Sequence, residues 1–128
     1  MRIMFVYLIF PVFVFYVKRL RKFAGRSCGP IIVIRKSHKE DIGLLAHELT
    51  HSRQLYRSFG LWWVLYLFKK KRHAYEVEAY AEQLRLSTNT RKDIPVFARY
   101  LSEWYNTGVS HIEAEIDLTR EYHANHSR

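Results

Sequence analysis

The sequence predicts a mainly helical domain of the α+β class, with a short strand element just before its central helix. The chain has 128 residues, which is enough for one hydrophobic core but not for two. Hydrophobic residues make up 48% of it and aromatic residues 16%, a composition that excludes a disordered chain. Helix start signals, namely two capping boxes and a proline suited to a first turn, recur from Ser37 onward. Together these observations predict one compact domain built mostly from helices.

An apolar N-terminal segment, residues 1–26, is expected to precede the domain itself, residues 27–128. Residues 3–17 carry no charge, and lysines and arginines cluster directly after them. A spanning helix needs about 20 apolar residues, so this run is short, and Pro11 interrupts it. The pattern leaves open a membrane-inserted helix, a buried strand or strand pair, and a cleaved signal peptide. If the run spans a membrane, its basic C-terminal flank predicts a cytoplasmic location for the rest of the chain.

The central helix is expected to begin near Glu40 and to end near Ser58. It follows residues 31–34, which are all β-branched and predict a short buried strand. Ser37 and Glu40 form a capping box that satisfies free backbone N–H groups of the first turn. Gly60 suits the left-handed conformation that terminates many helices. The helix carries an apolar stripe formed by Ile42, Leu45, Leu49 and Leu55.

A second apolar run, residues 61–68, is followed at once by the basic residues 69–72. Eight residues are too few to span a bilayer. Two alternatives remain open: a core helix with a basic tail, or an interfacial segment with tryptophans at the headgroups and lysines on anionic phosphate. Further helices are expected over residues 73–86, from Pro95 to near Gly108, and from a second capping box at Ser110 and Glu113.

His47, Glu48 and His51 form an H-E-x-x-H pattern inside the predicted central helix. Because the two histidines are four residues apart, one helical face can present both imidazoles to a single metal ion. Glu48 lies about 100° round the helix from His47, near enough to reach a metal-bound water. This combination is typical of a zinc site with a catalytic base.

A catalytic zinc ion takes three protein ligands, so the third must come from another segment. The longer pattern H-E-x-x-H-x-x-G-x-x-H is absent, because Gln54 and Arg57 stand at its glycine and final histidine positions. Glu76 and Glu78 are the candidates on the next predicted helix. Glu78 lines up with Ala81, Glu82 and Arg85, which is typical of a solvated face. The face of Glu76 is less polar and consists of Ala79, Tyr80, Gln83 and Leu84. Packing therefore favours Glu76 over Glu78.

Residues 44–51, followed by Glu76 and Tyr80, resemble the minimal gluzincin-type zinc metallopeptidases. Such families carry H-E-x-x-H on one helix and E-x-x-A-D or E-x-x-A-N on a later one. The chain is also similar to short phage and bacterial proteins with an H-E-L-T-H helix. The resemblance covers residues 31–86 and implies a zincin-like fold, with Zn²⁺ held by the two histidines and Glu76. Tyr80 departs from the pattern, which usually has Asp or Asn there to support the metal site.

The predicted enzyme is a hydrolase, a zinc metallopeptidase acting on a peptide or protein substrate. In this hypothesis zinc and Glu48 activate the water, and Glu48 passes the proton to the leaving amine. Tyr75 and Tyr80 are candidates to stabilise the tetrahedral oxyanion. Both lie on the helix that carries the third ligand.

The charge of the chain indicates an anionic partner, since its formal net charge is +9. Both basic clusters follow apolar aromatic runs, which favours a membrane surface over nucleic acid. Cys28 is the only cysteine, which excludes an intrachain disulfide. We therefore expect a membrane-associated protein. The alternative function is a small basic membrane-associated protein with a structural or non-proteolytic zinc site.

Overall fold

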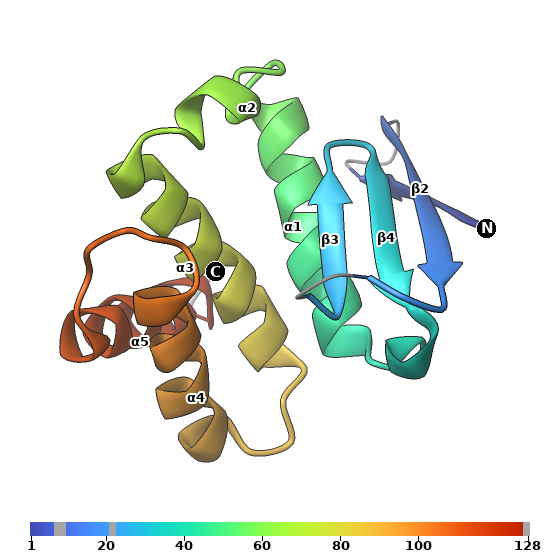
Figure 1. Cartoon of the computed structure of the whole chain (residues 1–128). Helices are drawn as coiled ribbons and strands as arrows, with labels where there is room; N and C mark the ends of the chain where they lie inside the picture. The colour runs from blue at the N-terminus through green and yellow to red at the C-terminus, as the bar shows by residue number, and fades with distance from the viewer. Residues whose placement is uncertain (7–9, 21–22, 127–128) are drawn as a thin grey trace. The chain divides into compact units, whose positions relative to one another are not determined.

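The structure, a computed structural model, describes residues 1–6, 10–20 and 23–126, and the chain divides into two compact units, residues 1–62 and 63–128. The described residues form a four-stranded sheet in the first unit and five α-helices along the chain (Figure 1). The predicted α+β class is therefore confirmed. The sheet is larger than the single strand element that the sequence predicted.

The sheet of the first unit has the strand order β1-β2-β4-β3. Strand β1 (Arg2–Val6) pairs antiparallel with β2 (Phe10–Val17), and β3 (Gly25–Cys28) pairs antiparallel with β4 (Ile31–Arg35). The two central strands, β2 and β4, run parallel to each other. The strand predicted before the central helix corresponds to β4.

The apolar N-terminal run forms β1 and β2 within its described residues. Along β2, Val12 and Val14 are fully buried whereas Phe15 is exposed, as is Phe5 on β1. This alternation has a period of two, which a strand produces and a helix does not. The strand-pair alternative is therefore correct, the membrane-inserted helix is wrong, and an apolar segment separate from the fold is not supported. Among the described residues, no helix is both long and apolar enough to cross a membrane.

The central helix is α1 (Ile42–Arg57), and Asp41 caps it. The Asp41 carboxylate accepts a hydrogen bond from the backbone N–H of Leu44 at 2.9 Å. The capping box predicted at Ser37 is wrong, because Lys36–His38 forms a separate 3-10 turn and the Ser37 hydroxyl lies 3.0 Å from His38 Nδ1. The helix stops as predicted: Gly60 has a φ of +83° and donates its N–H to a carbonyl of the last turn.

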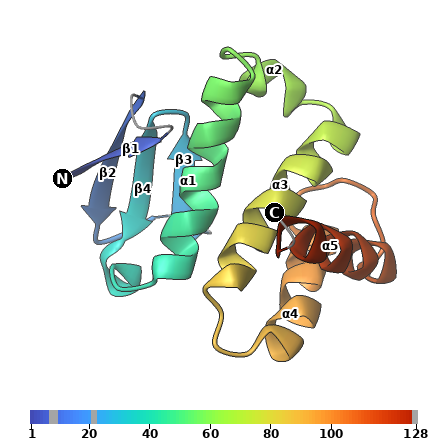
Figure 2. The same cartoon turned by 180° about the vertical axis from the view of Figure 1, so that it is seen from behind.

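One side of α1 packs on the sheet, as Figure 2 shows from behind. Leu44, Leu45 and Leu49 contact the buried strand residues. Two hydrogen bonds lock this packing: Ser52 Oγ donates to the Gly29 carbonyl at 2.6 Å, and the Tyr56 hydroxyl donates to the Pro11 carbonyl at 2.9 Å. The predicted stripe is correct at Leu45, Leu49 and Leu55 and wrong at Ile42, which is exposed.

The second unit is helical, and its core is formed where three helices meet. A single turn, α2 (Trp62–Leu65), precedes α3 (Lys69–Arg85), which is followed by α4 (Thr90–Glu103) and α5 (His111–His126). The fully buried core residues of this unit are Ala81, Leu84, Ala98, Leu101, Ala114 and Leu118.

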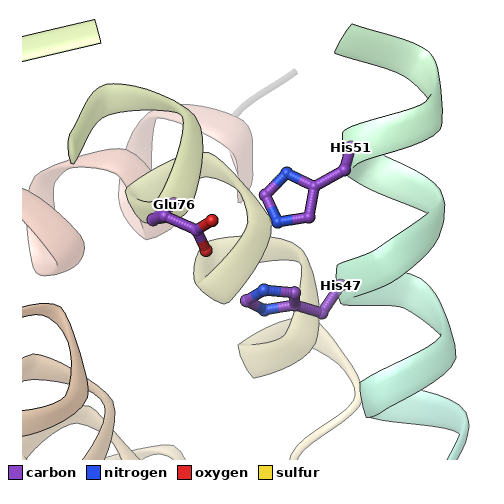
Figure 3. A group of neighbouring side chains, drawn as sticks. All are labelled: His47, His51 and Glu76. Carbon is purple, nitrogen blue, oxygen red and sulfur yellow. The ribbon is translucent and has the colours of Figure 1, made fainter. Parts of the chain in front are cut away.

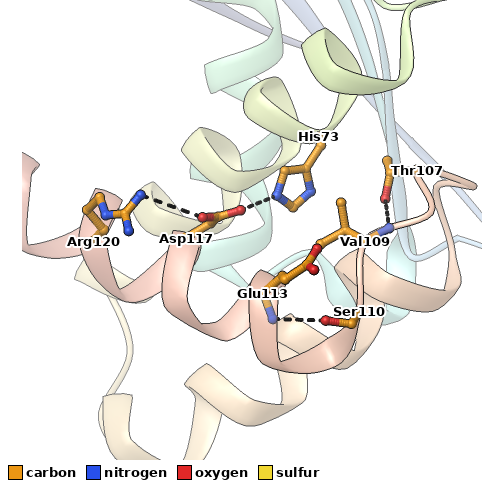
Figure 4. A network of polar contacts seen from close by, with 7 residues as sticks. All are labelled: His73, Thr107, Val109, Ser110, Glu113, Asp117 and Arg120. Atoms are coloured by element: carbon orange, nitrogen blue, oxygen red, sulfur yellow. Dashed lines mark hydrogen bonds and ion pairs between the residues drawn. The ribbon is translucent and has the colours of Figure 1, made fainter.

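The capping residues fix where α4 and α5 begin. Asn89 caps α4 through its side-chain oxygen, which accepts from the Lys92 N–H at 3.2 Å, so the start predicted at Pro95 is five residues late. Ser110 caps α5 as predicted, since its hydroxyl accepts from the Glu113 N–H at 3.2 Å (Figure 4). The same view shows His73 of α3 against Asp117 of α5, with Nε2 and Oδ2 2.9 Å apart.

Candidate metal centre

The polar face of α1 carries His47 and His51, one helical turn apart. Their ring centroids are 5.0 Å apart, and each side chain is only 5% exposed. Leu45 and Leu49, on the opposite side of the helix, are packed on the sheet, which fixes the rotation of α1 about its axis. Both imidazoles therefore project from one face, as the i, i+4 spacing requires.

Gln54 determines which nitrogen of His51 carries the proton. Trp62 Nε1–H can only donate, and it lies 3.1 Å from Gln54 Oε1, which identifies that atom as the amide oxygen. The same oxygen is 3.0 Å from His51 Nδ1, so Nδ1 must donate to it. In the neutral imidazole the lone pair then lies on Nε2, which is the form that a metal ion binds.

Glu48 follows His47 on α1 and is also 5% exposed. Its side chain lies beside Gly25 of β3. A methyl group added to Gly25 would come within 3.3 Å of both Glu48 Cγ and Glu48 Oε1. Glycine at this position therefore leaves the space that the carboxylate occupies.

Glu76 lies on the buried side of α3 and is 2% exposed. The Tyr66 hydroxyl donates a short hydrogen bond of 2.6 Å to Glu76 Oε1. Arg72 in turn holds the backbone near Tyr66, since its guanidinium donates to the carbonyls of Tyr66 at 3.1 Å and Tyr105 at 2.7 Å. The carboxylate is thus oriented by a tyrosine whose own position is fixed.

His47, His51 and Glu76 form the one group of three or more His, Cys, Asp or Glu side chains, among the described residues, that could hold a metal ion (Figure 3). Each offers one ligand atom, these atoms lie within 4.8 Å of one another, and all three residues are buried. Tetrahedral ligands at zinc bond lengths lie about 3.4 Å apart, a separation that falls within the 4.8 Å of this group. The group contains Glu76 and not Glu78, which is half-buried.

The two predicted oxyanion stabilisers lie in different surroundings. Tyr80 belongs to the core of the second unit, and its hydroxyl is 2.8 Å from that of Tyr105. Desolvation, followed by the charge of Glu76, raises the pKa of Tyr105 well above its usual value, so this phenol keeps its proton. Tyr75 is half-buried on α3. An oxyanion role for Tyr75 or Tyr80 stays a prediction.

Three residues around the ligands were missed at the level of sequence: Gln54, Trp62 and Tyr66. Gln54 carried a signal, because it stands three residues after His51 and so lies on the same helical face. Trp62 and Tyr66 carried none, because they lie in an apolar run that contains two further aromatic residues, Trp63 and Phe68. Only their hydrogen bonds distinguish them from their neighbours.

Comparisons of the chain with protein-family models, with curated proteins and with solved structures found no match. A functional conclusion therefore has to come from the chemistry of the site itself.

Proposed function

We propose that this protein is a zinc-dependent metallopeptidase of the minimal gluzincin type, with a zincin-like fold. The observation that supports this most is the buried group His47, His51 and Glu76, with Glu48 beside the first ligand. Two imidazoles and one carboxylate are the ligands of catalytic zinc in several hydrolases, whereas structural zinc usually has four ligands that include cysteine. Cys28 is exposed and lies outside the group, which favours a catalytic site over a structural one.

Zinc bound by these residues would polarise a scissile carbonyl and lower the pKa of a bound water to about 7. Glu48 is the residue that accepts the water proton and delivers it to the leaving amine. Gln54 keeps His51 in the tautomer that leaves Nε2 for the ion, and Tyr66 orients the Glu76 carboxylate. These hydrogen bonds orient the side chains of His51 and Glu76.

The strand next to Glu48 supports a peptide as the substrate. β3 pairs only with β4 among the described residues, so its other edge carries backbone N–H and C=O groups that can pair with an extended peptide. Gly25 opens this strand and lies beside the Glu48 carboxylate. A peptide aligned along β3 would therefore present its backbone near the proposed base.

The test measures bound metal and turnover in the same preparations of the full chain. We expect one zinc per chain, loss of zinc in His47→Ala and Glu76→Gln, and cleavage of an unfolded protein substrate by the zinc-loaded wild type. Glu48→Gln should retain zinc and lose at least about a thousandfold in turnover, since it removes the proton acceptor.

Glu78→Gln is the matched control, because it makes the same change two residues away on α3 and should alter neither quantity. Zinc-free folded protein would refute the metal site. Full zinc occupancy without cleavage would instead support a structural or non-proteolytic zinc protein, and cleavage indifferent to Glu48→Gln would refute Glu48 as the base.

A further inference from the structure

Six large apolar side chains are exposed within ten consecutive residues, in contrast to the ligands, which are polar and buried. Phe59 is 94% exposed and Leu67 74%, although a folding chain gains by burying such groups. Phe59 also has a φ of +54°, a conformation that a bulky residue rarely adopts. We call residues 59–71 the apolar–basic segment. Its exposed apolar members are Phe59, Leu61, Trp63, Val64, Leu67 and Phe68.

The charge around this segment has one sign. Between Leu49 and Tyr75 the chain has six lysines and arginines and no aspartate or glutamate. Lys69, Lys70 and Lys71 are all exposed and directly follow Phe68. Three cations therefore lie at the end of the apolar surface, where an anionic partner would contact the cations and the apolar side chains together.

The backbone of the segment is held from its inner side. Trp62 is 5% exposed and donates to Gln54, and the Tyr66 hydroxyl donates to Glu76. Arg72 donates to the carbonyls of Tyr66 and, at 3.5 Å, of Leu67. Trp62 and Tyr66 therefore each hold the backbone beside them in place, while their exposed neighbours stay accessible. This lowers the entropy that docking would otherwise cost.

We infer that the apolar–basic segment docks on a membrane surface rich in anionic phospholipid. Tryptophan and phenylalanine insert at the level of the headgroups, and adjacent lysines bind the lipid phosphates. A second copy of the chain fits poorly, because it would bring like charges together. The segment lies in the plane of the interface, since its length is far below that of a spanning helix. The inference stands apart from the proposed peptidase activity.

Vesicle co-sedimentation of the full chain tests the inference, with phosphatidylcholine vesicles that contain either no or about 30% phosphatidylserine. We expect binding to the anionic vesicles only, weakened by salt. Replacing Lys69, Lys70 and Lys71 by Gln should weaken it about a hundredfold, or about fivefold for each lysine. The double variant Leu67→Ser with Phe68→Ser should weaken binding by a similar factor.

Matched controls come from equally exposed residues elsewhere in the second unit. Ile112→Ser with Ile116→Ser removes two apolar side chains that are 72% and 51% exposed, and Arg91→Gln with Lys92→Gln removes two exposed cations. Both should bind vesicles like the wild type. Equal binding to neutral vesicles would overturn the inference, and so would an equal loss in the controls. Self-association that the segment variants abolish, without vesicle binding, would assign the surface to a second copy.

Absence of vesicle binding would not count against the proposed peptidase activity, because zinc content and turnover are measured in solution without lipid. Conversely, vesicle binding by zinc-free His47→Ala protein would support docking even if the proposed metal site were wrong. A thermal melt of each variant by circular dichroism confirms that it is folded, since the substituted side chains are exposed and contribute little to stability.

Discussion

The two apolar runs of this chain, residues 3–17 and 61–68, look alike in sequence and fold differently. Each is rich in aromatic residues, and each ends at a basic cluster. The first forms β1 and β2, with alternate side chains buried under α1. The second forms the single turn α2 followed by further turn residues, with most of its large side chains exposed.

The difference lies in what each run can pair with. The first run finds backbone partners in β4 and a helix to cover one face, so half of its side chains become core. The second run has no strand partner among the described residues. Two of its aromatic side chains instead donate hydrogen bonds to residues outside the run, Trp62 to Gln54 and Tyr66 to Glu76. Apolar content alone therefore does not separate a structural run from one that supports a site.

The largest expected effect comes from Val14 of the first run, which is fully buried in the sheet. Val14→Asp should destabilise the protein by about 4 kcal/mol, because it buries a charge without a partner. Leu67→Asp, the same kind of change in the exposed second run, should cost less than about 0.5 kcal/mol. Urea unfolding followed by circular dichroism measures both, and similar losses in the two variants would break the comparison.

A smaller effect is expected for Tyr66, the second-run residue that donates to the proposed ligand Glu76. Tyr66→Phe keeps the ring and removes the hydrogen bond, and should weaken zinc binding about tenfold or more, as loss of a ligand's supporting partner does. Tyr16→Phe makes the same change in the first run and should leave zinc affinity unchanged. Competition with a chromophoric chelator measures both. Equal affinities in the two variants would remove Tyr66 from the site.

The smallest effect is expected for Trp62, which supports His51 through Gln54. Trp62→Phe retains most of the buried ring and removes the donor, so His51 loses part of its orientation, and zinc affinity should fall about threefold to tenfold. Trp63→Phe, at the exposed neighbouring position, should have no effect on affinity. If Trp62→Phe and Trp63→Phe change zinc affinity equally, the buried and the exposed tryptophan of the second run do not differ in their support of the site.

The sequence was sufficient for features that depend on local spacing. The two histidines are one helical turn apart whatever the surroundings, and Gly60 ends α1 because few other residues adopt its conformation. Glu76 could be preferred to Glu78 from the helical face alone. These predictions needed only the periodicity of one helix.

Other features depended on partners distant in the sequence. A run of β-branched and aromatic residues is compatible with a strand or a helix, and only its pairing with β4 decided for strands. Ser37 and Asp41 are both good helix caps, and the 3-10 turn determined that Asp41 is used. Tyr66 and Trp62 could not be found in advance, because nothing in their local pattern indicates what they contact.

The order of the two units along the chain has a consequence for biosynthesis. Every strand that the structure describes and the whole of α1 belong to residues 1–62, so both histidines are synthesised before Glu76 is added. Domains fold largely in the order of synthesis, at about 5–20 residues per second. An unfinished chain would therefore present two imidazoles without their carboxylate partner, and the proposed enzyme would stay inactive until its second half is made.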